Sequence, residues 1–115
     1  MKLYGIPNCN TVKKARAWLA EHQVDAEFHD FKKDGVDESL LNSWLTQVPW
    51  EKLVNRAGMT WRNLDEQAKN SVKDNPSAVK LMLDKPSVIK RPVLVEEGKI
   101  LSLGFDEAAY QKLLK

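Results

Sequence analysis

Residues 2–19 of the chain read KLYGIPNCNTVKKARAWL, and this stretch joins a short strand to a helix. We expect the strand to cover residues 2–6 and the helix to cover residues 11–22. The helix shows an apolar face at helical spacing, made by Val12, Ala15, Trp18 and Leu19. The sequence therefore predicts that Cys9 lies where the strand ends and the helix begins.

Cys9 is the single cysteine of the chain. A thiol at a helix N-terminus faces unpaired backbone N–H groups and the positive end of the helix dipole, and both favour the nucleophilic thiolate. The alternative is that Cys9 is a small buried hydrophobe, the usual role of a lone cysteine. The polar neighbours Asn8 and Asn10 favour an accessible thiol. Both interpretations stay open at this point.

Composition limits the class of protein. A chain of 115 residues with 43% apolar residues and four tryptophans predicts one folded domain over residues 1–115. The net charge of +2 and the interleaved acids and bases give no indication of nucleic-acid binding. One cysteine excludes an internal disulfide and a multi-thiolate zinc site, and we expect no metal site. Met1 leads directly into a strand and no long apolar span follows, so we expect a cytoplasmic protein that does not bind membranes.

A second strand is expected over residues 26–31, where polar and aromatic residues alternate. Strand, helix and strand with short joints form a parallel βαβ unit. A helical insertion follows over about residues 37–86, with one helix capped by Asp37 and another capped by Asn75, with Pro76 at its first position. We expect the insertion to turn Met59 and Leu83 inward.

The C-terminal part predicts a hairpin of residues 92–95 and 100–103, joined by a turn that contains Gly98. Asp106 then caps a last helix, with Phe105 and Tyr110 at the positions of a hydrophobic staple. The element order is β-α-β, several helices, then β-β-α. This order predicts an α/β protein of the thioredoxin-like plan, with a mixed four-stranded sheet and helices inserted between its halves.

The dipeptide Arg91-Pro92 opens the third strand. In this plan that strand runs antiparallel beside the first, so Pro92 comes close to Cys9. We expect the Arg91–Pro92 peptide bond to be cis, because X-Pro is the common place for a cis bond. Arg91 would then lower the pKa of Cys9 and bind an anion with its guanidinium. The alternative for Arg91 is a solvent-exposed charge.

Four motifs carry a resemblance that extends over almost the whole chain, in the right order. They are Tyr4-x-x-Pro7-x-Cys9, the run KARAWL at 14–19, Asn55-Arg56, and IKRPV at 89–93. Together they resemble the ArsC-like family of thioredoxin-fold proteins, which includes glutaredoxin-dependent arsenate reductases and the Spx regulators. The chain looks most similar to the YffB-like branch, proposed to be glutathione-dependent thiol reductases.

The resemblance implies roles for Cys9, Arg56 and Arg91, which match the family's attacking cysteine and two of its anion-binding arginines. At three positions the chain differs from the arsenate reductases or from the Spx regulators of this family. Gly5 stands where the arsenate reductases carry a histidine, Leu103 or Gly104 stands where they carry a third arginine, and Val12 stands where Spx regulators often carry a second cysteine.

The resemblance thus implies a thiol-dependent oxidoreductase, and the expected function is glutathione-dependent thiol-disulfide reduction through Cys9. Substrate or anion binding is expected from Asn8, Asn10, Thr11, Pro92 and Lys13, although a solvated helix face also explains Lys13. We expect no bound cofactor, glutathione or another small thiol as co-substrate, glutaredoxin as a further partner, and a monomer. Two alternatives stay open: an Spx-like regulator that binds RNA polymerase, and an arsenate reductase.

Overall fold

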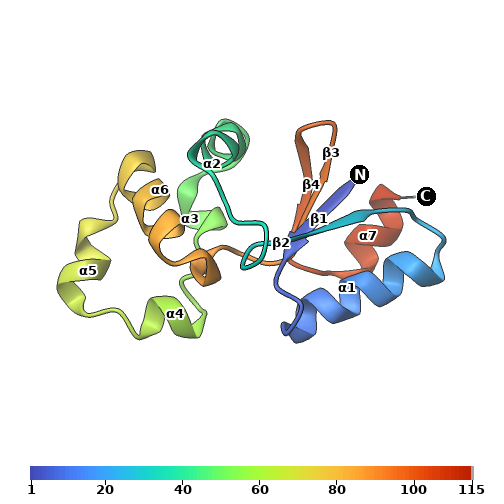
Figure 1. Ribbon diagram of the computed structural model, residues 1–115, viewed down its shortest axis with the longest axis horizontal. Helices are drawn as coiled ribbons and strands as arrows, with labels where there is room; N and C mark the ends of the chain where they lie inside the picture. The colour runs from blue at the N-terminus through green and yellow to red at the C-terminus, as the bar shows by residue number, and fades with distance from the viewer. Residues whose placement is uncertain (115) are drawn as a thin grey trace. The chain divides into compact units, whose positions relative to one another are not determined.

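The computed structural model describes residues 1–114 and contains one sheet and a set of mostly short helices (Figure 1). The elements in chain order are β1 (Lys2–Gly5), α1 (Asn10–Glu21), β2 (Glu27–Asp30), α2 (Glu38–Leu45), α3 (Trp50–Leu53), α4 (Met59–Arg62), α5 (Glu66–Ser71), α6 (Asn75–Asp84), the 3₁₀ turn η1 (Pro86–Val88), β3 (Val93–Glu96), β4 (Lys99–Leu103) and α7 (Glu107–Leu113).

The four strands form a mixed sheet in the order β2-β1-β3-β4. β1 pairs with β2 in parallel, as the βαβ connection requires, and Leu3 lies opposite Phe28. β1 pairs with β3 antiparallel, with Leu3 opposite Leu94, and β3 pairs with β4 antiparallel. The predicted α/β class, strand directions and hairpin are therefore confirmed.

The described residues form two compact units. One contains Met1–Gly35 and the segment from Arg91 onward, and we call it the α/β unit. The other is Val36–Lys90, which contains α2 to η1, and we call it the helical unit. The expected insertion of about residues 37–86 has nearly the same limits, while the expectation of a single domain stays a prediction.

The α/β unit has its core between the sheet and two helices, α1 and α7, which lie on the same side of the sheet (Figure 1). The buried members of this core are Leu3, Ala15, Trp18, Leu19, Leu94 and Tyr110. The ring of Tyr110 meets Trp18 edge-on at 5.5 Å and Phe105 edge-on at 4.8 Å between centroids. The latter contact is the predicted staple, and Asp106 caps α7 by accepting from the backbone N–H of Ala108.

The helical unit is built from helices of four to ten residues, and three of them begin at an aspartate whose side chain accepts a backbone N–H. These caps are Asp37, Asp65 and Asp74. A bridge between Val54 and Ile89 ties the middle of the unit to its end. No helix among residues 1–114 is both long enough and apolar enough to span a bilayer.

Three details predicted for this unit are wrong. The N-cap of α6 is Asp74, not Asn75, because the Asp74 carboxylate and Ser77 form a reciprocal capping box, which leaves Pro76 one position further along the helix. Met59 is 68% exposed and Leu83 is 38% exposed, so neither points inward. Met59 opens a helix of only four residues, which has too little surface to bury every apolar side chain.

Candidate functional site

Cys9 is the N-cap of α1, directly before its first residue Asn10. Its backbone is extended, with φ −93° and ψ 125°, as an N-cap requires. The backbone N–H of Cys9 donates to the carbonyl of Ile6 at 3.2 Å, and the carbonyl of Cys9 accepts from Lys13 at 2.9 Å. These bonds hold the turn between β1 and α1 and leave the thiol half-buried, at the predicted joint.

The environment of Cys9 favours its thiolate. Partial burial raises the pKa of the thiol, but hydrogen bonding from the Val12 amide, the hydrogen bond and positive charge of Arg91, and the Thr11 amide together outweigh burial. The net result is a pKa below the usual value. These groups stabilise the negatively charged form of the sulfur more than the neutral thiol.

The Arg91–Pro92 peptide bond is cis, as predicted. Pro92 is buried, and its carbonyl accepts from the backbone N–H of Gly104 at 2.8 Å. Arg91 is half-buried, and its guanidinium contributes to the stabilisation of the Cys9 thiolate. The start of β3 and the end of β1 thus meet at Cys9, because the two strands are antiparallel neighbours.

Gly5 lies where the first turn of α1 approaches the end of β1. A Cβ added at Gly5 would lie 2.8 Å from Cγ2 of Val12, so a larger residue there would have to displace Val12. Gly104, after β4, has φ +80° and is buried, and a side chain at this position would be strained. A side chain is therefore disfavoured at both glycines, by the contact with Val12 at Gly5 and by the backbone conformation at Gly104.

The other predicted site residues fall into two groups. Asn8, Asn10, Thr11 and Lys13 are exposed and lie in the joint or the first turn of α1. Arg56 belongs to the helical unit, where its guanidinium lies over the ring of Trp50, 5.6 Å from the centroid. The expected role of Arg56 in the Cys9 site stays a prediction.

The amide of Val12 also belongs to the site, although it was not among the residues predicted from the sequence. The second and third residues of a helix point their N–H groups at the N-cap side chain. Once Cys9 is placed at the cap, this rule selects Thr11 and Val12. The signal was therefore present in the sequence, but it depended on the exact residue at which α1 begins.

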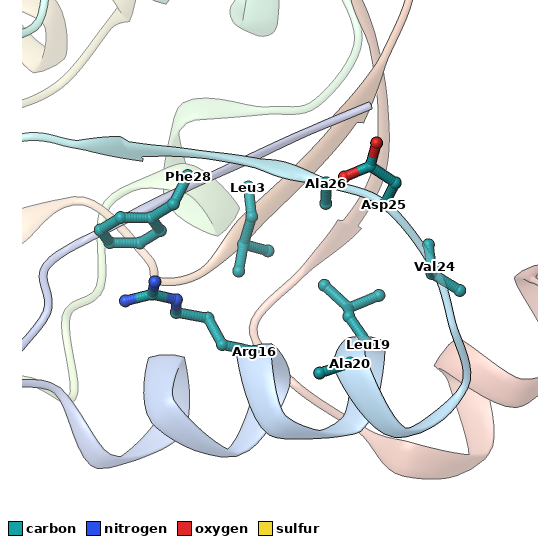
Figure 2. Close-up of a pocket in the computed structure, with 8 residues that line it drawn as sticks. All are labelled: Leu3, Arg16, Leu19, Ala20, Val24, Asp25, Ala26 and Phe28. Carbon is teal, nitrogen blue, oxygen red and sulfur yellow. The ribbon is translucent and has the colours of Figure 1, made fainter.

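A hollow of about 220 Å³ lies between α1 and β2 (Figure 2). Arg16 crosses it, with its guanidinium carbon 4.3 Å from the centre of the Phe28 ring. Leu3 and Leu19 form part of its apolar wall. The residues that line it do not include the first turn of α1, so this hollow is separate from the Cys9 site. No group of three His, Cys, Asp or Glu within residues 1–114 is arranged to hold a metal ion.

The model of the ArsC family matches residues 4–113. A solved structure of a protein called YFFB superposes with a TM-score of 0.90 at 47% identity, covering 98% of this chain and 97% of that one. An arsenate reductase (ArsC) related protein from Brucella melitensis superposes with a TM-score of 0.79 at 50% identity, covering 100% and 96%. The global transcriptional regulator Spx of Streptococcus pyogenes is 29% identical over 108 residues, covering 91% of this chain and 78% of its own length.

Proposed function

The chain belongs to the ArsC family, and from this premise we propose that it is a thiol-disulfide reductase that uses Cys9 as its nucleophile and glutathione as its co-substrate. One observation carries the proposal: the single thiol belongs to the N-cap residue of α1 beside Arg91, and its pKa is lowered. A structural cysteine needs no such surroundings. A nucleophilic one does, because only the thiolate attacks a disulfide.

The chemistry needs two exchanges at Cys9, because the chain has one cysteine. The Cys9 thiolate attacks one sulfur of a substrate disulfide, a new bond forms between the Cys9 Sγ and that sulfur, and the old S–S bond breaks. The departing sulfur leaves as a thiolate and takes a proton from water. A glutathione thiolate then attacks the substrate sulfur of the mixed disulfide, so a glutathione–substrate disulfide forms and the Cys9 thiolate leaves. A second glutathione thiolate attacks this disulfide in solution, which forms glutathione disulfide and releases the remaining half of the substrate as a thiolate.

The other site residues have supporting roles in this proposal. Arg91 stabilises the Cys9 thiolate each time it is released, as it does in the resting protein. The amides of Asn10 and Thr11, with Asn8, Lys13 and the backbone at Pro92, bind the incoming thiol compound. Arg56 binds an anionic group of the substrate or of glutathione.

The test compares the wild type with Cys9→Ser in a coupled assay of glutathione oxidation, using a small mixed disulfide as substrate. We expect Cys9→Ser to lose turnover completely while its circular dichroism and unfolding midpoint stay close to those of the wild type, because the half-buried Cys9 side chain is replaced by one of similar size. The matched control is Ser102→Ala, a change of similar size on β4, which should keep full activity. Turnover that persists in Cys9→Ser would refute the proposal.

The likeness to Spx favours a second candidate, a regulator that binds RNA polymerase. The position of its switch cysteine is Val12 here, so such a function would not depend on an internal disulfide. Affinity capture of RNA polymerase from a bacterial lysate distinguishes the two functions. Equal recovery with wild type and Cys9→Ser, together with no turnover by either, would favour the regulator.

Arsenate reduction is the third candidate, because a related structure carries that description. Gly5 and the pair Leu103-Gly104 argue against it, since none of these residues offers a charged side chain to an oxyanion. We expect the purified protein to leave arsenate unreduced when glutathione and glutaredoxin are supplied. Arsenite formation that depends on Cys9 would restore this candidate.

A further inference from the structure

A second hollow, of about 610 Å³, lies between α1 and the start of α7 in the α/β unit. Trp18 and Phe105 supply its apolar surface, and Trp18 is 6% exposed. Its rim is polar and exposed, with Thr11 and Glu21 among its α1 residues. We call this hollow the α1–α7 groove. Apolar surface below a charged rim is typical of a site for a long side chain with a charged end.

The α1–α7 groove begins at the Cys9 site. Thr11 lines the groove, and the amide of the same residue contributes to the lowered pKa of Cys9. From Thr11 the groove follows α1 to Glu21, a length of about 15 Å at about 1.5 Å per helical residue. An extended polypeptide covers this length in about four to five residues. A chain attached to Cys9 through its own cysteine would therefore bring a residue at about that distance to the far end.

Acidic side chains outnumber basic ones among the residues that line the groove. Lys14 lines it near the thiol, whereas Glu21, Asp106 and Glu107 supply three carboxylates. One oxygen of Asp106 accepts from Ala108 at 3.2 Å, while Glu21 and Glu107 are exposed at the rim. Glutathione carries two carboxylates and one ammonium group, so the excess of acids disfavours its carboxylates. A lysine or arginine side chain fits the same surface in both charge and shape.

We propose that the α1–α7 groove seats an extended polypeptide whose cysteine is held in a disulfide and which carries a basic side chain about four residues from that cysteine. This inference rests on the proposed function and names its substrate class. The Cys9 thiolate attacks the cysteine sulfur of the polypeptide, the polypeptide becomes disulfide-linked to Cys9, and the second half of the original disulfide leaves as a thiolate. Glutathione then releases the polypeptide as a glutathione mixed disulfide.

Two synthetic peptides test this groove. Each peptide carries one cysteine activated as a 2-pyridyl disulfide. One peptide has Lys four residues before and four residues after that cysteine, and the other peptide has Glu at the same two positions. Release of pyridine-2-thione, followed by stopped flow at low salt, gives the rate for each peptide. We expect the wild type to react about three- to tenfold faster with the Lys peptide. The protein's net charge of +2 would by itself favour the Glu peptide, so this preference reports the groove.

Two charge-reversal variants test whether the preference for the Lys peptide arises in the groove. Glu21→Lys places a cation at the end of the groove and at the C-terminal end of α1, where the helix dipole accepts it, and it should bring the Lys-to-Glu rate ratio down to about one or below. Glu27→Lys makes the same charge change on β2, outside the groove, and should keep the wild-type ratio.

Three outcomes would overturn the inference. Equal rates for the two peptides in the wild type would remove the groove from the reaction, and so would a Glu27→Lys variant that loses the preference as fully as Glu21→Lys. Both results leave the proposed function standing if Cys9 reacts with neutral 2,2′-dithiodipyridine and glutathione regenerates it. Failure of Cys9 to react with that small disulfide would refute the proposed function and the groove together.

Discussion

The α/β unit and the helical unit are stabilised in different ways. In the α/β unit, the central pair of strands joins the two ends of the chain, with Leu3 opposite Leu94. In the helical unit, helices such as α2 begin with an aspartate that caps the backbone three residues ahead. This difference determines which unit can form a site from residues that are far apart in the sequence. Non-local pairing can bring Arg91 to Cys9, whereas capping organises only neighbours in sequence.

The largest effect is expected from the core of the α/β unit. Leu94 is fully buried on β3, and Leu94→Ala should lower the free energy of unfolding by about 2–5 kcal/mol, because it leaves a cavity between the sheet and its two helices. Urea unfolding followed by tryptophan fluorescence measures the loss. The control is Leu83→Ala on the helical unit, whose side chain is 38% exposed and should cost less than about 1 kcal/mol. Equal losses would show that the burial of Leu94 does not set the cost.

Replacing one arginine in each unit compares the effects of the two units on the thiol and on turnover. Arg91→Ala should raise the pKa of Cys9 and slow turnover at neutral pH roughly tenfold, because the thiolate loses a charged hydrogen-bond donor. The pH dependence of iodoacetamide alkylation reports the pKa of the single thiol. Arg56→Ala, in the helical unit, should leave this pKa unchanged and lower turnover on anionic substrates. A shift in the pKa of Cys9 in Arg56→Ala would show that the helical unit acts on the thiol directly.

A smaller effect is expected from a single cap. Asp37 accepts from the backbone N–H of Leu40 at 2.8 Å, and Asp37→Ala should cost about 1 kcal/mol because that donor loses its partner. Chemical unfolding measures the loss, and Asp37→Asn, which keeps an accepting oxygen, should recover most of it. A loss as large as that of Leu94→Ala would show that the caps matter as much as the core.

The smallest effect at neutral pH is expected at Tyr110. Its hydroxyl is buried without a hydrogen-bond partner among residues 1–114, so Tyr110→Phe should change the free energy of unfolding by less than about 1 kcal/mol, in the stabilising direction. Thermal unfolding at neutral pH measures this change. A clear destabilisation would mean that the hydroxyl is bonded.

At alkaline pH the free energies of unfolding of the wild type and of Tyr110→Phe should differ further. Burial raises the pKa of Tyr110 to about 12, above the unfolded value near 10. The folded state therefore binds the proton more tightly, and the stability that it contributes is present below about pH 10 and is lost as pH rises toward 12. Tyr110→Phe should lack this part of the alkaline loss, which chemical unfolding of both proteins at neutral and at alkaline pH measures.

The sheet could be predicted well because short stretches of sequence mark where its strands begin and end. Cys9 lies between a strand pattern and a helix pattern, and Pro92 marks the start of a strand, so the place where they meet follows from strand order alone. The helical unit was less predictable in detail. Asp74 and Asn75 are adjacent candidates for one cap, and only the geometry of Ser77 selects between them. The α1–α7 groove could not be predicted, because its apolar surface appears only when Trp18 and Phe105 pack together.

The antiparallel pairing of β1 with β3 also has a consequence for the order of synthesis. Cys9 is synthesised before Arg91, and 82 positions along the chain separate the two residues. A nascent chain therefore carries a thiol without the guanidinium that activates it, at the time when unfolded neighbours are most exposed to unwanted cross-links. Arg91 can act on the thiol only after β3 has been synthesised and has paired with β1, so the fold itself delays the activation of the nucleophile.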